Sequence, residues 1–280
     1  MLSDTMLADY ARTGVLILEN FVPPDACDAL RRRAAELVDG FDPASVQSVF
    51  STTEQTQHGD RYFLESGDKI RFFFERDAWD DGGSLRAPRI DCLNKIGHAL
   101  HDLDSVFDAF SRTPDLGEVV RRLGVADPAI IQSMYIFKPP HIGGEVVCHQ
   151  DSTFIYTEPE SCIGFWFALE DATPENGCME FIPGVHRQPL RQRNRRTASG
   201  DSTVTEALDA TPWPEHLKVP APASKGSLVI FSGRTPHLSA ANNSSRSRHA
   251  YTLHVIDRQC HYPADNWLQR GPDLPLRGFE

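Results

Sequence analysis

The fold is decided by the stretch QSMYIFKPPHIGGEVVCHQD (residues 132–151), in which Pro and Gly separate two apolar runs. Each run, 130–137 and 145–149, has the length of one strand, and the residues between them end the first. The same texture continues toward the C-terminus. We expect further strands at 162–169, 179–182, 227–231 and 248–256. Such a series of short strands broken by turns is typical of a β-sandwich or jelly roll.

The first half of the chain carries more helical signals. Apolar residues at helical spacing predict helices at 25–38, 90–103 and 116–123. Apolar and β-branched runs predict strands at 14–21 and 69–75. Helices mainly before strands indicate a single domain in which helices pack on one face of a mainly β core.

One long segment, residues 187–224, fits neither pattern. It is rich in Arg and then in Pro, with little periodicity. Long segments of this kind inside a compact domain are usually functional or mobile. We therefore interpret it as an insertion between strands, and as a candidate lid, within one domain covering residues 1–280.

Composition excludes several classes of partner. Lys and Arg number 28 and Asp and Glu 39, which gives a formal charge of −11. Nucleic acids and anionic lipids both require a basic surface. The N-terminus lacks the basic start of a signal peptide, and the six cysteines form no C-x-x-C pair. We expect a cytoplasmic protein with reduced thiols and a small-molecule substrate, with no nucleic acid or membrane as partner; the oligomeric state is not predicted.

The chemistry centres on His149-Gln150-Asp151. Residues two apart on a strand point the same way, so His149 and Asp151 face one side, while Gln150 points away. An imidazole and a carboxylate are two parts of the 2-His-1-carboxylate triad that binds iron(II) and leaves coordination positions open.

The third ligand should come from a later strand of the same wall, and His237 fits. It lies 88 positions after His149, a spacing compatible with two facing strands joined through a long insertion. A lone His-x-Asp tripeptide is a weak signal, and most bind nothing. Among the other histidines, we interpret His186 as a structural turn residue and His254 as a strand residue without a carboxylate partner at strand spacing.

An iron of this kind can bind a 2-oxo acid and O2 at its open positions, and the far carboxylate of 2-oxoglutarate then needs a cation. Arg is favoured because its planar fork binds a carboxylate through two hydrogen bonds. Arg246 and Arg248 share parity, so the pattern alone does not choose between them. Ser239 has the parity of His237 and is a further candidate.

Several ordered stretches match one known family. They are DKIRFFFE (68–75), NKIGHALH (94–101), residues 132–159, residues 164–186, SSRSRHAYTLHV (244–255) and PADNWLQ (263–269). On these stretches the sequence resembles the phytanoyl-CoA dioxygenase family. The resemblance implies a double-stranded β-helix, a cupin-like jelly roll with flanking helices. It also implies iron(II), 2-oxoglutarate as cosubstrate and O2, with ascorbate as a candidate reductant.

The resemblance also assigns residues. The iron ligands fall on His149, Asp151 and His237. The 2-oxoglutarate contacts fall on Lys95, Met134, Trp166, Ser239 and Arg248, which decides the tie in favour of Arg248. On periodicity alone, Lys95 is a charged helix residue, and Met134 and Trp166 are core residues.

The implied activity is hydroxylation of an unidentified small molecule, with decarboxylation of 2-oxoglutarate to succinate and CO2. Two alternatives remain open at this point. One is a cupin-like hydrolase or isomerase that uses zinc or manganese. The other is a non-catalytic protein that binds 2-oxoglutarate. Phe154, Phe165 and Phe167 are candidates either for apolar surface near the substrate or for core.

Overall fold

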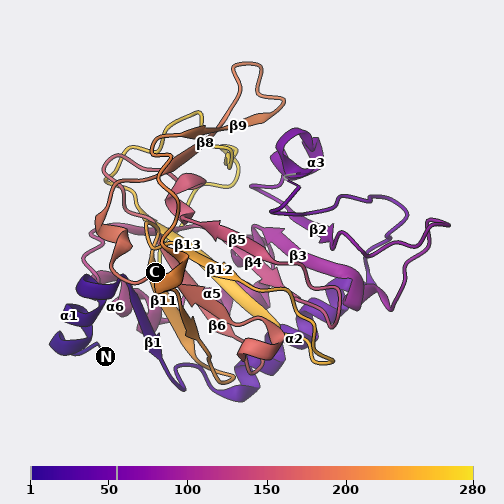
Figure 1. Cartoon of the computed structure of the whole chain (residues 1–280), viewed down its shortest axis with the longest axis horizontal. Coiled ribbons are helices and arrows are strands. Elements are labelled where there is room, and N and C mark those ends of the chain that lie inside the picture. Colours follow the sequence, from indigo (N-terminus) through magenta and orange to yellow (C-terminus); the bar gives the residue numbers. More distant parts are fainter. Residues whose placement is uncertain (1, 55, 280) are drawn as a thin grey trace.

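The computed structural model describes residues 2–54 and 56–279 and contains two facing antiparallel sheets (Figure 1). The larger sheet runs in the order β1 (Val15–Leu18), β11 (Leu228–Ser232), β6 (Ile163–Ala168), β13 (Ala250–Asp257), β4 (Pro128–Ile136), β3 (Leu93–His98) and β2 (Ile70–Phe74). The smaller sheet runs in the order β10 (Val219–Ala221), β7 (Met179–Phe181), β12 (His237–Ser239) and β5 (Val146–His149). A separate hairpin consists of β8 (Gln192–Arg196) and β9 (Thr203–Ala207).

Alternation along the central strands explains the two layers. On β6, Phe165 and Phe167 belong to the apolar cluster shared with the helices, whereas Trp166 belongs to the cluster shared with Phe181 of the smaller sheet. Successive strand residues point to opposite faces, so β6 must be covered on both sides. All of its residues are buried accordingly. This arrangement confirms the mainly β jelly roll with flanking helices.

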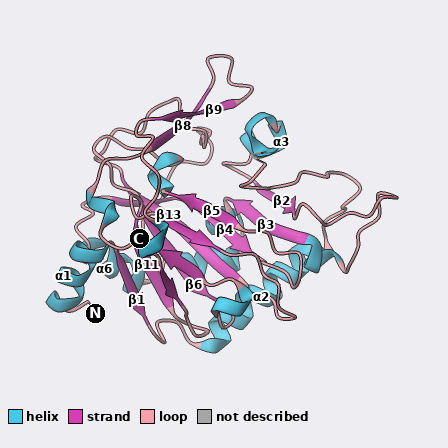
Figure 2. Ribbon diagram, viewed as in Figure 1, coloured by secondary structure: helices cyan, strands magenta, loops and turns pink. Residues whose placement is uncertain are grey.

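Helices cover the outer face of the larger sheet (Figure 2). They are α1 (Asp4–Thr13), α2 (Pro24–Asp39), α4 (Leu100–Leu103), α5 (Ser105–Ser111) and α6 (Pro114–Arg122). The short helix α3 (Arg61–Leu64) lies apart from them, and its Phe63 and Leu64 belong to a separate cluster with Trp267. Helix α2 begins with Pro24, whose fixed φ suits the first turn, and buries Cys27, Leu30, Ala34 and Val38 at helical spacing. None of the helices described in residues 2–54 and 56–279 is long and apolar enough to span a bilayer.

Short 3₁₀ helices connect several of these elements. They are η1 (Thr56–Gly59), η2 (Arg89–Cys92), η3 (Asp151–Thr153), η4 (Pro174–Asn176), η5 (Val185–Arg187) and η6 (Glu215–Leu217). Of these, η3 matters most for the site, because it follows β5 directly and begins with Asp151.

The predicted helix at 90–103 is wrong. This segment forms η2, strand β3 and the short helix α4. Leu93 and Ile96 fit helical spacing, but β3 lies between β2 and β4 and forms hydrogen bonds with both. Tertiary pairing therefore overrides the local pattern. Lys95 consequently lies on a strand instead of a helix.

The segment 187–224 has more structure than its composition indicates. It contains the β8–β9 hairpin, η6 and strand β10. Helices α1 and α5 also form where we predicted none. The other predicted strands and the helices at 25–38 and 116–123 are confirmed to within a few residues.

Candidate functional site: a His–Asp–His centre in a deep cavity

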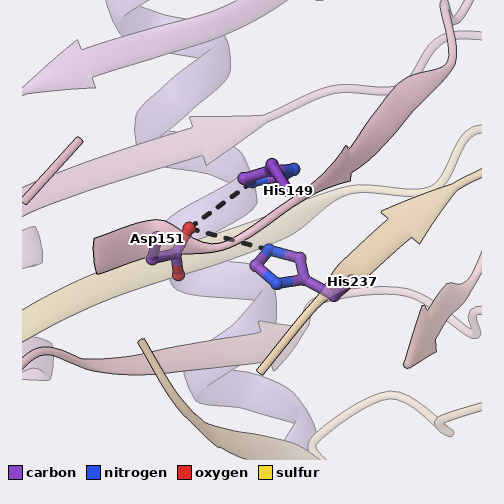
Figure 3. A group of neighbouring side chains, drawn as sticks. All are labelled: His149, Asp151 and His237. Atoms are coloured by element: carbon purple, nitrogen blue, oxygen red, sulfur yellow. Dashed lines mark ion pairs between the residues drawn. The ribbon is translucent and has the colours of Figure 1, made fainter. Parts of the chain in front are cut away.

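His149, Asp151 and His237 meet at one point (Figure 3). One ligand atom from each lies within 4.8 Å of the others. The Nε2 atoms of His149 and His237 are 3.5 and 3.6 Å from Oδ1 of Asp151. Gln150 is extended, so the strand alternation continues past the end of β5 and Asp151 points the same way as His149.

The two histidines lie on neighbouring strands of one sheet. His237 of β12 is directly opposite His149 of β5 in the antiparallel register, and the ring centres are 4.3 Å apart. The expectation that the two strands face each other across the barrel is therefore wrong, whereas the expectation that they share one wall is confirmed. The intervening chain passes through the opposite sheet and returns.

Both imidazole rings are fixed with Nε2 toward the centre. Nδ1 of His149 bonds to the carbonyl of Val147 at 2.8 Å, and Nδ1 of His237 to that of Thr235 at 3.0 Å. A carbonyl only accepts, so each Nδ1 must carry the proton, and each Nε2 keeps its lone pair. Burial lowers the pKa of His237 to about 4, so this ring stays in its neutral form.

Asp151 is held as a carboxylate. Burial alone would raise its pKa, but the interactions with the surrounding imidazole rings, those of His254 and His237 foremost, outweigh burial and hold the pKa well below its usual value. Nε2 of His254 donates to Oδ2 of Asp151 at 2.9 Å, which leaves Oδ1 facing the two histidines. Gln150 points away, as predicted. Its Nε2 donates to the backbone carbonyl of Arg234, and its Oε1 accepts a hydrogen bond from the backbone N–H of Arg191.

The sequence analysis did not predict that His254 has a carboxylate partner. No carboxylate lies at strand spacing from His254, because its partner Asp151 is 103 positions away in the sequence and meets β13 only through tertiary structure. A signal was available, since His254 interrupts the otherwise apolar run from Leu253 to Ile256. His186 is structural, as interpreted, because its Nε2 contacts the carbonyl of Ala11 at 3.3 Å.

The centre lies in a cavity of about 530 Å³. The other sequence-predicted site residues line the same cavity: Lys95, Met134, Trp166, Ser239 and Arg248. Phe154 also lines it, with its ring centre 5.9 Å from that of His149. Phe165 and Phe167 belong to the core on the helix side.

Arg248 is a buried cation with spare donors. Its Nε donates to the carbonyl of Gly177 at 3.1 Å, and Nη2 to the hydroxyl of Ser239 at 3.3 Å. Its Nη1 is buried and has no hydrogen-bond partner among the described residues. Burial lowers its pKa to about 10, so the guanidinium remains charged near neutral pH. Arg246, the other candidate, is exposed.

Lys95 and Met134 form the adjacent side of the cavity. Nζ of Lys95 lies 3.8 Å from Sδ of Met134 and 3.0 Å from the ring centre of Phe50. Burial lowers the pKa of Lys95 to about 7, and the charge of Glu75 opposes this shift. Nε1 of Trp166 is also buried without a partner among the described residues.

The side chains present fit a metal and an anionic ligand. Two Nε2 lone pairs and one ionised carboxylate oxygen at a single point form a donor set suited to iron(II), with positions left open. Buried donors without partners are unfavourable unless a ligand or water satisfies them. The Nη1 group of Arg248 and the indole N–H of Trp166 thus indicate a ligand with acceptor oxygens at this end of the cavity.

Solved structures with known cofactors share this fold. The non-heme alpha ketoglutarate dependent carbocyclase SnoK from nogalamycin biosynthesis matches with a TM-score of 0.65 and 18% identity, covering 98% of this chain and 96% of that chain. The epimerase SnoN in complex with Fe3+, alpha ketoglutarate and nogalamycin RO matches with a TM-score of 0.64 and 14% identity, covering 99% and 93%. At such identities the likeness establishes the jelly-roll fold.

Sequence relatives are much closer. A protein of Danio rerio described as phytanoyl-CoA dioxygenase domain-containing protein 1 is 43% identical, covering 99% of this chain and 98% of its own. The phytanoyl-CoA dioxygenase of Arabidopsis thaliana is 43% identical, covering 96% and 94%. The profile of the family described as Phytanoyl-CoA dioxygenase (PhyH) matches residues 10–250. The chain therefore belongs to the phytanoyl-CoA dioxygenase family.

Proposed function

We propose that this protein is an iron(II)- and 2-oxoglutarate-dependent dioxygenase that hydroxylates a small molecule. The observation that carries the proposal is the meeting of two Nε2 lone pairs and one carboxylate oxygen within 4.8 Å, inside a cavity that also holds a buried arginine with spare donors. The family membership and the iron- and alpha ketoglutarate-dependent structural neighbours support the same class of enzyme.

In this proposal, His149, Asp151 and His237 hold the iron. The carbonyls of Val147 and Thr235 fix the two imidazole rings, and His254 fixes the carboxylate. Partners of this kind orient ligands and increase their basicity.

Arg248 holds the far carboxylate of 2-oxoglutarate through Nη1 and Nη2. Its Nε bond to Gly177 and the neighbouring hydroxyl of Ser239 keep the guanidinium in place. Trp166 offers its indole N–H from the side, while Lys95 and Met134 close the adjacent wall. A planar cation with two parallel donors suits a carboxylate better than a lysine does.

Iron with 2-oxoglutarate and O2 supplies the oxidising chemistry, in which 2-oxoglutarate, O2 and a C–H bond give succinate, CO2 and an alcohol. The protein orients the reactants and excludes water around them. Phe154 places an apolar surface beside His149, which suits the C–H group of a substrate. Ascorbate would keep the iron reduced. We also propose a cytoplasmic location, in keeping with the six free cysteines.

The buried Arg248 favours this proposal over a zinc or manganese hydrolase, because such an enzyme needs no anion site beside its metal. The test is anaerobic titration of the protein with iron(II) and then 2-oxoglutarate. We expect a visible charge-transfer band that forms only when both are present, and CO2 release from labelled 2-oxoglutarate once air is admitted. Absence of the band when iron(II) and 2-oxoglutarate are both present would refute the proposal and favour the hydrolase, and the band without CO2 release would indicate a non-catalytic binder.

A further inference from the structure

Two rows of side chains cross the floor of the cavity. In the first, Trp166, Thr252 and Met134 lie side by side on β6, β13 and β4. In the second, His254 and Gln132 are neighbours on β13 and β4. The first row holds the proposed 2-oxoglutarate contacts. In the second row His254 fixes Asp151, whereas the function proposed above gives Gln132 no task.

His98 lies on the next strand, β3, where its register partner on β4 is Ser133, the neighbour of Gln132 in the sequence. His98 is fully buried and lines the cavity. The hydroxyl of Ser66 donates to the carbonyl of Phe63 at 2.5 Å, so its proton is already used. The 2.6 Å bond between Ser66 and Nδ1 of His98 must therefore have Nδ1 as the donor.

The opposite ring nitrogen of His98 is consequently an acceptor. Nε2 carries a lone pair, is buried, and has no hydrogen-bond partner among the described residues. Burial holds the pKa of His98 well below its usual value, so the ring stays neutral. A buried acceptor without a partner costs about 1–3 kcal/mol. Only a ligand or water that donates an O–H or N–H can satisfy it.

His254 has a second ring nitrogen that the contact with Asp151 does not use. Its Nε2–H donates to Asp151, and its Nδ1 lies on the opposite side of the ring. This Nδ1 is also buried without a partner among the described residues. Gln132, whose amide can donate and accept, is the register partner of His254 and lines the same cavity. The cavity therefore contains one buried acceptor on His98, one amide on Gln132 and one buried nitrogen of His254 without a partner among the described residues.

The β8–β9 hairpin forms another wall of the same cavity, and its lining is uncharged. Gln192 and Asn194 of β8 and Thr203 and Thr205 of β9 line the cavity. They share one face of the hairpin, where Asn194 bonds Thr205 at 2.9 Å. The hairpin is thus a polar wall built of amides and hydroxyls.

The arginines of the hairpin are already paired. Arg193 and Arg195 lie on the other face, where they bind Asp265 and Glu206. Arg196 shares the cavity face, but its guanidinium donates to the carbonyls of Leu64, Gly200 and Trp267. This wall therefore offers no free cation to a phosphate or carboxylate.

The remaining surface near His98 is aromatic. Phe63 and Trp267 stack with ring centres 4.5 Å apart, and both meet the edge of the His98 ring. Both side chains line the cavity. Aromatic walls of this kind bury aliphatic segments of a ligand.

From this arrangement we infer that His98, Gln132, His254 and the inner face of the β8–β9 hairpin form the prime-substrate subsite, and that it takes an uncharged molecule with hydroxyl or amide N–H groups on an aliphatic segment. The inference rests on the proposed function, which assigns the other row to 2-oxoglutarate. Carboxylates and phosphates only accept hydrogen bonds, so they leave Nε2 of His98 unsatisfied.

The test is calorimetric titration of protein loaded anaerobically with iron(II) and 2-oxoglutarate. The probes are octanol, octanamide, octanoate and octanoyl-CoA, which share one alkyl chain. We expect octanol and octanamide to bind at least about tenfold more tightly than the two anionic probes. Anionic probes that bind as tightly, or neutral probes that do not bind, would overturn the inference. Failure to bind 2-oxoglutarate in the loading step would instead refute the proposed function.

Matched variants locate the binding. Gln132→Leu and Thr205→Val keep the side-chain volume and remove the polar groups, so octanamide binding should weaken by about tenfold in each. Arg195→Gln, on the other face of the hairpin, is the control and should leave octanamide binding unchanged. Thermal unfolding checks that each variant is folded. If folded Gln132→Leu and Thr205→Val proteins bind octanamide like wild type, the subsite lies elsewhere and the inference fails.

Discussion

Replacement of Arg248 by Met tests the cosubstrate site most sharply. The change keeps a long unbranched side chain in the same buried volume but removes the cation. Nη1 has no partner among the described residues, and Nη2 has only a 3.3 Å contact with Ser239. Both donors are therefore available to a carboxylate, whereas Nε is already committed to Gly177.

The expected magnitude follows from these two donors. Hydrogen bonds to charged groups contribute about 1.5–3 kcal/mol each, so the loss of two weakens 2-oxoglutarate binding by about 3–6 kcal/mol, or roughly 10²–10⁴-fold. Stability should change much less. The hydroxyl of Ser239 also donates to the carbonyl of Gly177 at 2.9 Å, so the substitution leaves no acceptor unpaired, and we expect a loss of about 1 kcal/mol.

The assay measures the 2-oxoglutarate dependence of succinate formation, with Arg246→Met as the control. Arg246 is exposed, so its replacement should change the Michaelis constant by less than about twofold. Arg248→Lys should lie between wild type and Arg248→Met, because lysine keeps the charge but loses the fork. Equal effects of the Arg246 and Arg248 substitutions, or a change of less than about fivefold in Arg248→Met, would refute the assigned role.

Three further predictions concern the metal centre and the core. His254→Leu removes the hydrogen bond to Asp151 and should weaken iron binding about 10–100-fold in an anaerobic titration; unchanged affinity would show that His254 does not support the ligand. Gly164→Ala places a methyl carbon 2.5 Å from the ring of Phe231 and 3.1 Å from Oδ2 of Asp151. It should therefore lower the free energy of unfolding by about 1–3 kcal/mol in urea titration and also weaken iron binding. A variant with the urea midpoint and the iron affinity of wild type would contradict this prediction. Burial lowers the pKa of His101 and of His249 to about 4, below the value in the unfolded chain. The unfolded chain therefore binds more protons, and the free energy of unfolding should fall as the pH decreases from about 6.5 to about 4. A urea midpoint that stays constant over this range would be inconsistent with neutral buried rings.

Local alternation predicted the part of the site that local structure determines. His149 and Asp151 point the same way because Gln150 between them is extended, even though β5 ends at His149. Parity could not choose between Arg246 and Arg248, because the two residues share parity and both precede β13, which begins at Ala250. Burial decides, and burial is a tertiary property.

The features that sequence reasoning missed all depend on tertiary contacts. Lys95 lies on β3 because strands on both sides pair with it, although its segment also fits helical spacing. The bond of His254 to Asp151 joins residues from separate parts of the fold. The β8 strand, QRNRR, is too polar to show the apolar alternation of a half-buried strand. Its arginines bind carboxylates and backbone carbonyls, and its other side chains face the cavity.

The central claim is that His149, Asp151 and His237 bind one iron ion while Arg248 holds 2-oxoglutarate beside it. The most direct measurement is a crystal structure of protein loaded anaerobically with iron(II) and 2-oxoglutarate, with anomalous scattering recorded at the iron edge. We predict one anomalous peak within about 2.0–2.3 Å of both Nε2 atoms and a carboxylate oxygen of Asp151, and the far carboxylate of 2-oxoglutarate on Arg248. An iron peak away from these three atoms, or 2-oxoglutarate bound without contact to Arg248, would contradict the account.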